Sequence, residues 1–541
     1  MFNISGNIID ITQRRIYPGT IRIQGGKIQA VRPSSTTETC FILPGFIDAH
    51  IHIESSLLVP SEFARLAAVH GTVAAVSDPH EIANVLGLKG IDFMLENAAK
   101  VPFKFFFGAP ACVPATPFET AGAKFGPDEL HKLLNRKDIY YLSEMMNVPG
   151  VLNASPGEID KLDIARLYGK RADGHSPGLR GRPAARYVKA GISTDHECLT
   201  LEEAREKIGY GMKILIREGS AARNLNELMP LIDEFPQRVM FCSDDRHPDD
   251  LVEEHIRHMV LRAKKEGLDL FNILQAACLN PIEHYGLDVG KLEKGDSADF
   301  IVIDNLEEMN ITAAYNQGQK TAEDGQPLIS RTRVEPINIF RAQTKSAADY
   351  SVPARPGKLK VIEIIEDQLI TGSVLAVPRL KDGNAVQDLD HDILKITVVN
   401  RYENRKPAVG FIKNFGLKKG ALASSVAHDS HNIVAIGATD EDLSRAVNLV
   451  INNKGGLAAV DGKDEMILPL PVGGIMSAQD GYEVARTYKK LDGKAKALGT
   501  GLKAPFMTLS FMALLVIPDL KLSDRGLFDG KTFQFTTLFS N

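Results

Sequence analysis

Short apolar and polar runs alternate over the first forty residues, a pattern typical of β-strands joined by tight turns. Gly25 and Gly26 lie between the apolar runs 21–23 and 27–31. Two glycines between such runs indicate a hairpin, because glycine adopts positive φ without strain. We therefore expect this part of the chain to form a small β-structure.

From about residue 43 to residue 286 the pattern changes to apolar runs separated by helical stretches. The clearest runs are 72–76, 103–107, 213–216 and 238–241. Strands that alternate with helices predict a parallel sheet. A stretch of about 240 residues is the usual size of a (β/α)8 barrel.

Beyond the predicted barrel, residues 290–303 return to a strand-and-turn pattern. We expect them to pair with the N-terminal hairpins. The polar, glycine-containing stretch 312–333 predicts surface loops. Further strands are expected at 361–365 and 396–399, and a helix is expected after Thr439, a suitable N-cap.

The predicted fold class is α/β, a (β/α)8 TIM-like barrel with two further domains. A small β-sandwich domain is formed from both flanks of the barrel, and a C-terminal α/β domain follows. The predicted boundaries are 1–43 plus 287–336 for the sandwich, 44–286 for the metal-binding barrel and 337–541 for the C-terminal domain.

Composition supports an ordinary soluble chain of more than one domain. It has 541 residues, of which 44% are hydrophobic and 24% charged. A net charge of −5 gives no indication of a nucleic-acid or membrane partner. The first six residues lack the pattern of a signal peptide. Five scattered cysteines suggest reduced thiols, so we expect a cytoplasmic protein.

The most informative chemistry lies at the end of the apolar run 41–52. His50 and His52 are two residues apart there. Side chains at i and i+2 of a strand point to the same face, so two imidazoles at a strand end can hold one metal ion. Taken alone, the pair would be two ordinary polar residues.

Later strand ends supply further candidate ligands. They are Glu144, His175, His196 and Asp244. Functional groups collect at the carboxyl ends of barrel strands, so these side chains are expected to converge with His50 and His52. Four histidines and two carboxylates can hold two divalent ions. The predicted division gives His50, His52 and Asp244 to one ion, His175 and His196 to the other, and Glu144 as the bridge. Such mixed ligands favour Mn²⁺ or Fe²⁺, with Zn²⁺ also suitable.

On these residues the chain resembles the amidohydrolase superfamily and, within it, the adenine deaminase family. The longer matching stretches are 44–56, 78–81, 143–147, 173–175, 217–222, 244–250, 429–432 and 506–511. Many relatives bridge their metals with a carboxylated lysine, whereas this chain has Glu144, as adenine deaminases do.

The resemblance implies hydrolysis of adenine to hypoxanthine and ammonia, with adenine and water as small-molecule partners. Water activated between two metal ions attacks C6 of the ring. Asp244 accepts the water proton and passes it to the departing amine. Protonation of N1 is assigned to Glu197, Glu81 or His80, without a ranking. The resemblance also implies that two chains can form a homodimer.

Other residues of the matching stretches have two interpretations each. Asp78 can hold substrate or cap a helix, and Glu218 and Ser220 can contact the purine or begin a helix. The pair His428 and His431 is expected in a solvated loop, although the resemblance favours a C-terminal domain that covers the barrel mouth.

Two other functions fit parts of the pattern. The first is a cyclic-amide hydrolase related to dihydroorotases or hydantoinases, which Glu144 argues against. The second is a non-catalytic scaffold with the same fold, which retention of all six ligands argues against.

Overall fold

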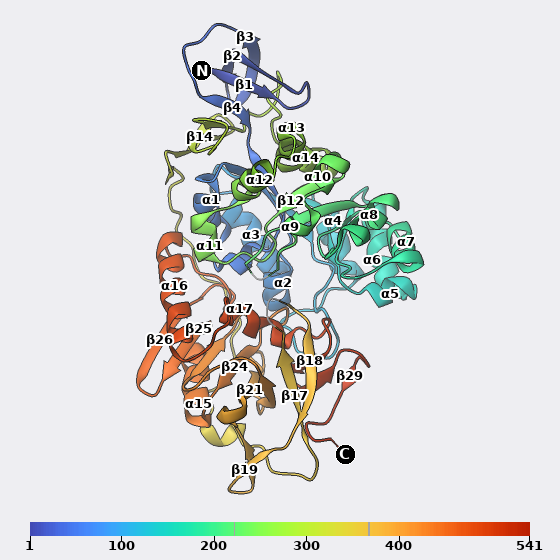
Figure 1. Cartoon of the computed structure of the whole chain (residues 1–541), viewed down its shortest axis with the longest axis vertical. Coiled ribbons are helices and arrows are strands. Elements are labelled where there is room, and N and C mark those ends of the chain that lie inside the picture. The colour runs from blue at the N-terminus through green and yellow to red at the C-terminus, as the bar shows by residue number, and fades with distance from the viewer. Residues whose placement is uncertain (221, 366–367, 541) are drawn as a thin grey trace.

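The computed structural model describes residues 1–220, 222–365 and 368–540, so Ala221 in one of the matching stretches lies outside the described residues. Figure 1 shows three regions along the long axis. A strand-rich region with the N-terminus is at the top, a barrel surrounded by helices is in the middle, and a second region of strands and helices with the C-terminus is at the bottom.

The middle region is a closed barrel of parallel strands. The strands are β5 (Phe46–Ile51), β6 (Thr72–Ser77), β7 (Lys104–Ala109), β8 (Ile139–Met145), β9 (Ala172–Gly174), β10 (Thr194–Asp195), β11 (Lys213–Arg217) and β12 (Val239–Cys242). Strands β5 to β9 form one sheet and β10 to β12 another. Parallel bridges between Ala172 and Ile192 and between Ile51 and Asp244 join the two sheets. The (β/α)8 barrel is therefore confirmed.

Helices surround the barrel and explain its apolar strands. They are η1 (Ile53–Ser56), α1 (Pro60–Ala68), α2 (His80–Leu86), α3 (Leu88–Ala98), α4 (Pro127–Leu134), α5 (Val148–Leu152), α6 (Pro156–Leu167), α7 (Gly181–Lys189), α8 (Leu201–Gly209), α9 (Leu225–Leu228), α10 (Leu231–Glu234), α11 (Pro248–Glu253), α12 (Ile256–Lys265), α13 (Leu270–Leu274), η2 (Gln275–Leu279) and α14 (Asn280–Tyr285). Every residue of β6 is buried. Strands covered on both faces read as continuous apolar runs, which is why they could be predicted.

Both flanks of the barrel contribute to one further sheet. Its strands are β1 (Phe2–Asp10), β2 (Arg15–Gln24), β3 (Lys27–Pro33), β4 (Phe41–Pro44), β13 (Phe300–Ile303), β14 (Ile311–Asn316), β15 (Gln319–Glu323) and β16 (Gln326–Pro327). The predicted hairpin joins β2 to β3, and β4 lies between β1 and β13. A bridge from Lys27 to Ser297 brings the β3 edge back toward β13, so the halves of the sheet enclose a shared core.

The prediction of loops over 312–333 is wrong for residues 312–327, which contain three strands. Strands β14, β15 and β16 occupy most of residues 311–327. Ala313, Ala314 and Ala322 are buried there. Antiparallel strands with one solvated face contain many polar residues, and small alanines on the covered face gave only a weak hydrophobic signal.

The C-terminal region contains an eight-stranded sheet with helices against it. Its strands are β17 (Leu359–Ile364), β18 (Thr371–Ala376), β21 (Ile393–Val399), β22 (Ala408–Lys413), β23 (Ala421–Ser424), β24 (Ile433–Gly437), β25 (Gly456–Asp461) and β26 (Asp464–Pro469). Smaller sheets contain β19 (Arg379–Lys381) with β20 (Asn384–Val386), and β27 (Leu520–Ser523) with β28 (Gly526–Asp529) and β29 (Gln534–Phe535). The helices are η3 (Ala347–Tyr350), η4 (Leu389–His391), α15 (Asp440–Asn452), α16 (Gly481–Ala497), α17 (Pro505–Ser510) and η5 (Phe511–Ala513).

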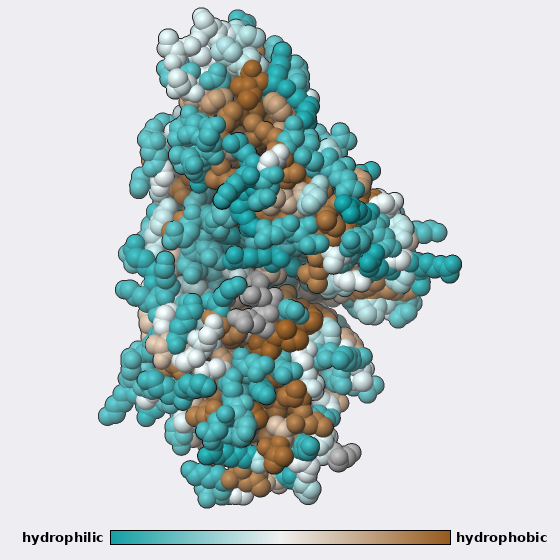
Figure 2. All heavy atoms as spheres, in the orientation of Figure 1, coloured by the Kyte–Doolittle hydropathy of each residue, from teal (hydrophilic) through white to brown (hydrophobic). Residues whose placement is uncertain are grey.

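The predicted N-cap of α15 is confirmed, because the Thr439 side chain accepts a hydrogen bond from the Asp442 N–H. Among the described residues, no helix combines the length and apolar character that a membrane crossing requires. Figure 2 shows hydrophobic residues gathered on the visible face of the C-terminal region, whereas hydrophilic residues cover most of the barrel.

Polar contacts fasten the C-terminal region to the barrel. The Thr120 hydroxyl donates to Asp524 Oδ2 at 2.7 Å, and Asn432 Nδ2 donates to the Thr120 carbonyl at 2.8 Å. Arg65 Nη1 lies 2.9 Å from Asp480 Oδ2. These contacts join segments more than three hundred residues apart, so the C-terminal region has a defined position over the barrel.

Gly45 joins β4 of the flanking sheet to β5 of the barrel, and a Cβ at this position would lie 2.3 Å from Val73 Cγ1. We expect Gly45→Ala to lower the thermal midpoint, at a cost of about 1–3 kcal/mol, since β-branched Val73 has few rotamers with which to yield. Gly157→Ala is the matched control, because nothing lies within 4 Å of its Cβ position. Circular dichroism melts measure both, and equal midpoints would contradict the expectation.

Candidate metal centre

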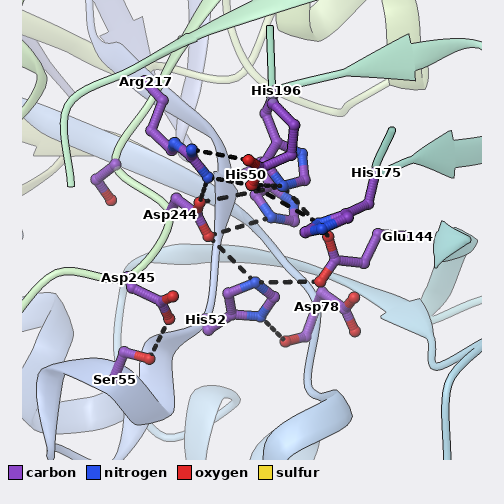
Figure 3. Close-up of polar contacts among 12 residues, drawn as sticks. His50, His52, Ser55, Asp78, Glu144, His175, His196, Arg217, Asp244 and Asp245 are labelled. Atoms are coloured by element: carbon purple, nitrogen blue, oxygen red, sulfur yellow. Dashed lines mark hydrogen bonds and ion pairs between the residues drawn. The ribbon is translucent and has the colours of Figure 1, made fainter. Parts of the chain in front are cut away.

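The carboxyl ends of the barrel strands bring the six predicted ligands together (Figure 3). His50 and Glu144 lie within β5 and β8, whereas His52, His175, His196 and Asp244 follow β5, β9, β10 and β12. Asp244 has a φ of 52°, in the left-handed region that aspartate tolerates better than most residues. Its N–H donates to the His50 carbonyl at 2.9 Å, so barrel closure also positions two ligands.

Glu144 lies between two groups of ligands and presents one oxygen to each. Its Oε2 is 3.0 Å from His175 Nδ1 and 3.2 Å from His196 Nε2. Its Oε1 is 3.5 Å from His52 Nε2, which in turn is 3.3 Å from Asp244 Oδ1. This position suits a bridge between two ions.

Two histidines present a ring nitrogen to this space. His52 Nδ1 lies 3.1 Å from the Asp78 carbonyl oxygen, which can only accept, so Nδ1 carries a proton and Nε2 is the nitrogen that faces Glu144 and Asp244. His50 Nε2 is buried 3.6 Å from Asp244 Oδ1 and has no hydrogen-bond partner among the described residues. An unpaired buried nitrogen is costly unless a ligand occupies it. The donors therefore fit divalent metal ions that accept imidazole and carboxylate.

The ligand atoms form overlapping groups, each within 4.8 Å. One contains His50, His196 and Asp244, and another contains Glu144, His175 and His196. The sequence pattern assigns His196 to the second ion alone, whereas in the structure it lies between both groups. The division of ligands between two ions stays a prediction.

Arg217, the last residue of β11, joins two carboxylates of the centre. Its Nη1 lies 2.5 Å from Asp244 Oδ2 and also contacts Glu197, while Nη2 lies 3.0 Å from Glu197 Oε2. All three side chains are buried. Arg217 is not among the predicted site residues, although a charged residue at the end of a predicted barrel strand is itself a signal of function.

The surroundings keep the central carboxylates ionised. Burial alone would raise the pKa of Asp244, but the positive charge of Arg217 holds that pKa well below its usual range. Burial also opposes ionisation of Glu144, yet His175 and His196 lower its pKa in the same way. Two anions are therefore available to bind cations.

The stretch 78–81 lies beside the centre. His80 Nδ1 is 3.1 Å from Asp78 Oδ2 and 3.6 Å from Glu144 Oε1, so Asp78 and His80 adjoin the ligands. Glu81 also lines the cavity, but its two oxygens contact His428 Nδ1 and His431 Nε2 of the C-terminal region.

The expectation that His428 and His431 lie in a solvated loop is wrong. They are 3% and 1% exposed, and both contact Glu81. The partners are 347 and 350 residues apart along the chain, so no local pattern could reveal the contact.

Glu218 and Ser220 do not reach the cavity that contains the ligands. The Glu218 carboxylate contacts Arg262 Nη1, and the Ser220 hydroxyl donates to Asp250 Oδ2 at 2.5 Å. The chain turns sharply after β11, where Gly219 N–H donates to the Ala222 carbonyl. This turn directs both side chains away from the ligands.

The cavity has one polar and one apolar side. The barrel contributes every predicted ligand except His50, together with Glu197 and Asp245, and Asp245 accepts a hydrogen bond of 2.5 Å from the Ser55 hydroxyl. The C-terminal region contributes an apolar wall of Leu369, Phe511, Leu514 and Ile517. Apolar side chains combined with a few polar groups are typical of a pocket that binds a small molecule.

Two family models match the chain. The amidohydrolase family model matches residues 41–327, and the adenine deaminase C-terminal domain model matches residues 368–534. Among curated proteins, adenine deaminase of Salinibacter ruber is 53% identical over 540 residues, which is 99% of each chain. Adenine deaminase of Methanosarcina mazei is 51% identical over 549 residues, again 99% of each chain. The chain therefore belongs to the amidohydrolase family and, within it, to the adenine deaminases.

Proposed function

We propose that this chain hydrolyses adenine to hypoxanthine and ammonia at a centre of two divalent metal ions. The observation that carries the proposal is the convergence of four histidines, Glu144 and Asp244 at one barrel mouth. The curated relatives, similar along their whole length and named adenine deaminases, support the substrate.

The six ligands would hold Mn²⁺ or Fe²⁺, with Zn²⁺ also compatible with the donor set. When bound, such ions make water acidic enough to attack at neutral pH and stabilise developing negative charge. Glu144 carries its own charge as the bridge, so assembly of the centre needs no added carbon dioxide.

Asp244 is proposed as the group that moves the proton during attack at C6. Its carboxylate takes a proton from the attacking water and gives it to the amine nitrogen that leaves as ammonia. Arg217 suits this role, because it keeps Asp244 ionised and fixes the orientation of its carboxylate. The attack also places charge on the ring, which protonation of N1 neutralises.

For that N1 proton, His80 is the best placed of the three candidates. All three line the cavity, and His80 Nδ1 is 3.6 Å from Glu144 Oε1. Glu81 and Glu197 are less suited, since His428 and His431 contact both oxygens of Glu81, and Arg217 contacts both oxygens of Glu197.

Cytoplasmic location and pairing of two chains are proposals of the same kind. All five cysteines are free, as expected in a reducing compartment. Strand β18 is at the edge of its sheet, and nearby Leu375, Val377 and Leu380 are exposed, which suits a second copy.

Chelation tests the need for metal. Protein stripped of metal should release no ammonia from adenine, because nothing then activates water, and Mn²⁺ or Fe²⁺ should restore the activity. Elemental analysis should find two ions per active chain. Hydantoin serves as the control substrate and should not be opened. Normal turnover by fully stripped protein would refute the proposal.

Asp244→Asn tests the proton transfer. The substitution keeps the shape of the side chain but removes its basicity, so kcat should fall by about 10²- to 10⁴-fold. Metal content, measured on the same preparation, separates this effect from loss of an ion. Near-normal kcat would exclude Asp244 as the base.

Arg217→Lys tests the orientation of Asp244. A lysine ammonium cannot bridge two carboxylates as a planar guanidinium does, so kcat should fall by about 100-fold. Arg182→Lys on the exposed face of α7 is the control and should match the unsubstituted protein. Equal kcat values for the two variants would show that Arg217 has no positioning role.

A further inference from the structure

The C-terminal region contributes a polar side chain to the predominantly apolar wall of the cavity. His428 lines this cavity and is 3% exposed. Its Nε2 is buried and has no hydrogen-bond partner among the described residues. A buried imidazole nitrogen without a partner, beside a cavity, indicates that a ligand satisfies it.

Glu81 fixes the opposite edge of the same ring. The surrounding histidines outweigh the effect of burial and hold the Glu81 pKa well below its usual range, so the carboxylate is ionised and only accepts. His428 Nδ1, in contact with Glu81 Oε1, therefore carries a proton. His431 secures the other oxygen, because its Nδ1 accepts from the Ala427 N–H at 3.2 Å, which leaves Nε2 as the donor to Glu81.

Phe511 fixes the plane of the His428 ring. The two rings are stacked, with centroids 4.6 Å apart and planes within 12° of parallel. Phe511 itself belongs to the apolar wall. Contacts on its edge and its face thus hold the imidazole in one orientation, a pre-organised arrangement typical of a binding residue.

We propose that His428 binds the substrate, through a hydrogen bond from Nε2 to a ring nitrogen of the purine whose C6 lies at the metal centre. The assignment rests on the proposed function. C6, its amine and N1 must face the barrel ligands and proton carriers. Of the other ring nitrogens, N9 carries the ring hydrogen, so N3 and N7 are the ones that can accept a hydrogen bond from the C-terminal wall. In this arrangement Glu81 and His431 are positioning residues.

The charges round His428 support a donor at Nε2. Burial lowers the pKa of His428, but Glu81, Asp245 and Asp429 outweigh it and raise the pKa to about 9. An imidazolium has N–H groups on both nitrogens, and N3 and N7 of adenine have lone pairs to receive one.

A third metal ion is the competing explanation. His80, Glu81 and Asp429 have ligand atoms within 4.8 Å of one another. His431 cannot join them as a ligand, because its Nδ1 accepts a hydrogen bond and its Nε2 carries the proton. Metal analysis distinguishes this case from substrate binding.

The experiment compares adenine with 3-deazaadenine and 7-deazaadenine, each of which has a C–H in place of one nitrogen. The readout is the ratio of kcat/KM for adenine to that for each analogue. The ratio does not depend on the fraction of folded protein. In the unsubstituted protein, one analogue should be about 10- to 100-fold worse than adenine, as expected for loss of a hydrogen bond to a charged group.

Two variants distinguish the roles of the two ring nitrogens of His428, Nδ1 and Nε2. In His428→Asn the amide nitrogen matches Nδ1 and can still reach Glu81, whereas in His428→Gln it matches Nε2 and can still reach the base. The preference for adenine over the sensitive analogue should shrink by about tenfold in His428→Asn and be largely retained in His428→Gln. His391→Asn, at an exposed position of η4, is the control and should leave the ratio unchanged. Intrinsic reactivity differences between the bases cancel, because they are the same in every variant.

Each result decides the assignment. Identical ratios in all proteins would overturn it and leave the proposed function intact. If the unsubstituted protein contains three ions per chain and His428→Asn contains two, His428 is a metal ligand and not a substrate-binding residue. No ammonia from adenine with metal-loaded, unsubstituted protein would overturn the proposed function and this assignment together.

Discussion

Burial of charge at the barrel mouth is the constraint on which the site depends. Glu144, Asp244 and Glu197 are almost wholly buried, and an unpaired carboxylate in such surroundings would be neutralised. Arg217 and the histidines prevent this by pairing with each of them. Removing one partner from such a network leaves an uncompensated buried charge, which costs more than the pair itself contributes. Binding of cations and retention of ionised carboxylates are thus two results of one arrangement.

The backbone supplies this arrangement through the closure of the barrel. The Asp244 N–H that donates to the His50 carbonyl belongs to the bridge between β12 and β5. The same bond therefore completes the sheet and sets the separation of two ligands. A loop could not hold them with similar accuracy, because strand ends in a closed barrel have little freedom.

The sequence predicts the parts of this protein that depend on local pattern. His50 and His52 follow an apolar run, and each later ligand follows or ends a strand, so strand assignment alone places them on one face. Arg217 was not predicted although it ends β11, because a single charged residue at a strand end does not by itself distinguish a functional role from a structural one. The contacts of Glu81 with His428 and His431 join two regions of the chain, and no periodicity records such a pairing. Glu218 and Ser220, for which contact with the purine was one of two interpretations, do not line the cavity, since a turn of a few residues reverses the direction of side chains that are close in sequence.

The barrel side of the cavity contains the groups proposed for catalysis, and the C-terminal side contains groups proposed to recognise the base. A barrel mouth with metal ligands supports many hydrolytic reactions, so the ligands by themselves do not select a purine. Selection must come from groups that contact the rest of the ring. The C-terminal region offers such groups to the cavity, namely the apolar side chains of Leu369, Phe511 and Leu514 and the imidazole proposed to bind the base, His428. Glu81 connects His428 to the barrel, because Glu81 follows barrel strand β6 and contacts both C-terminal histidines. A shift of the C-terminal region would therefore change the binding of the base while the barrel ligands stayed in place.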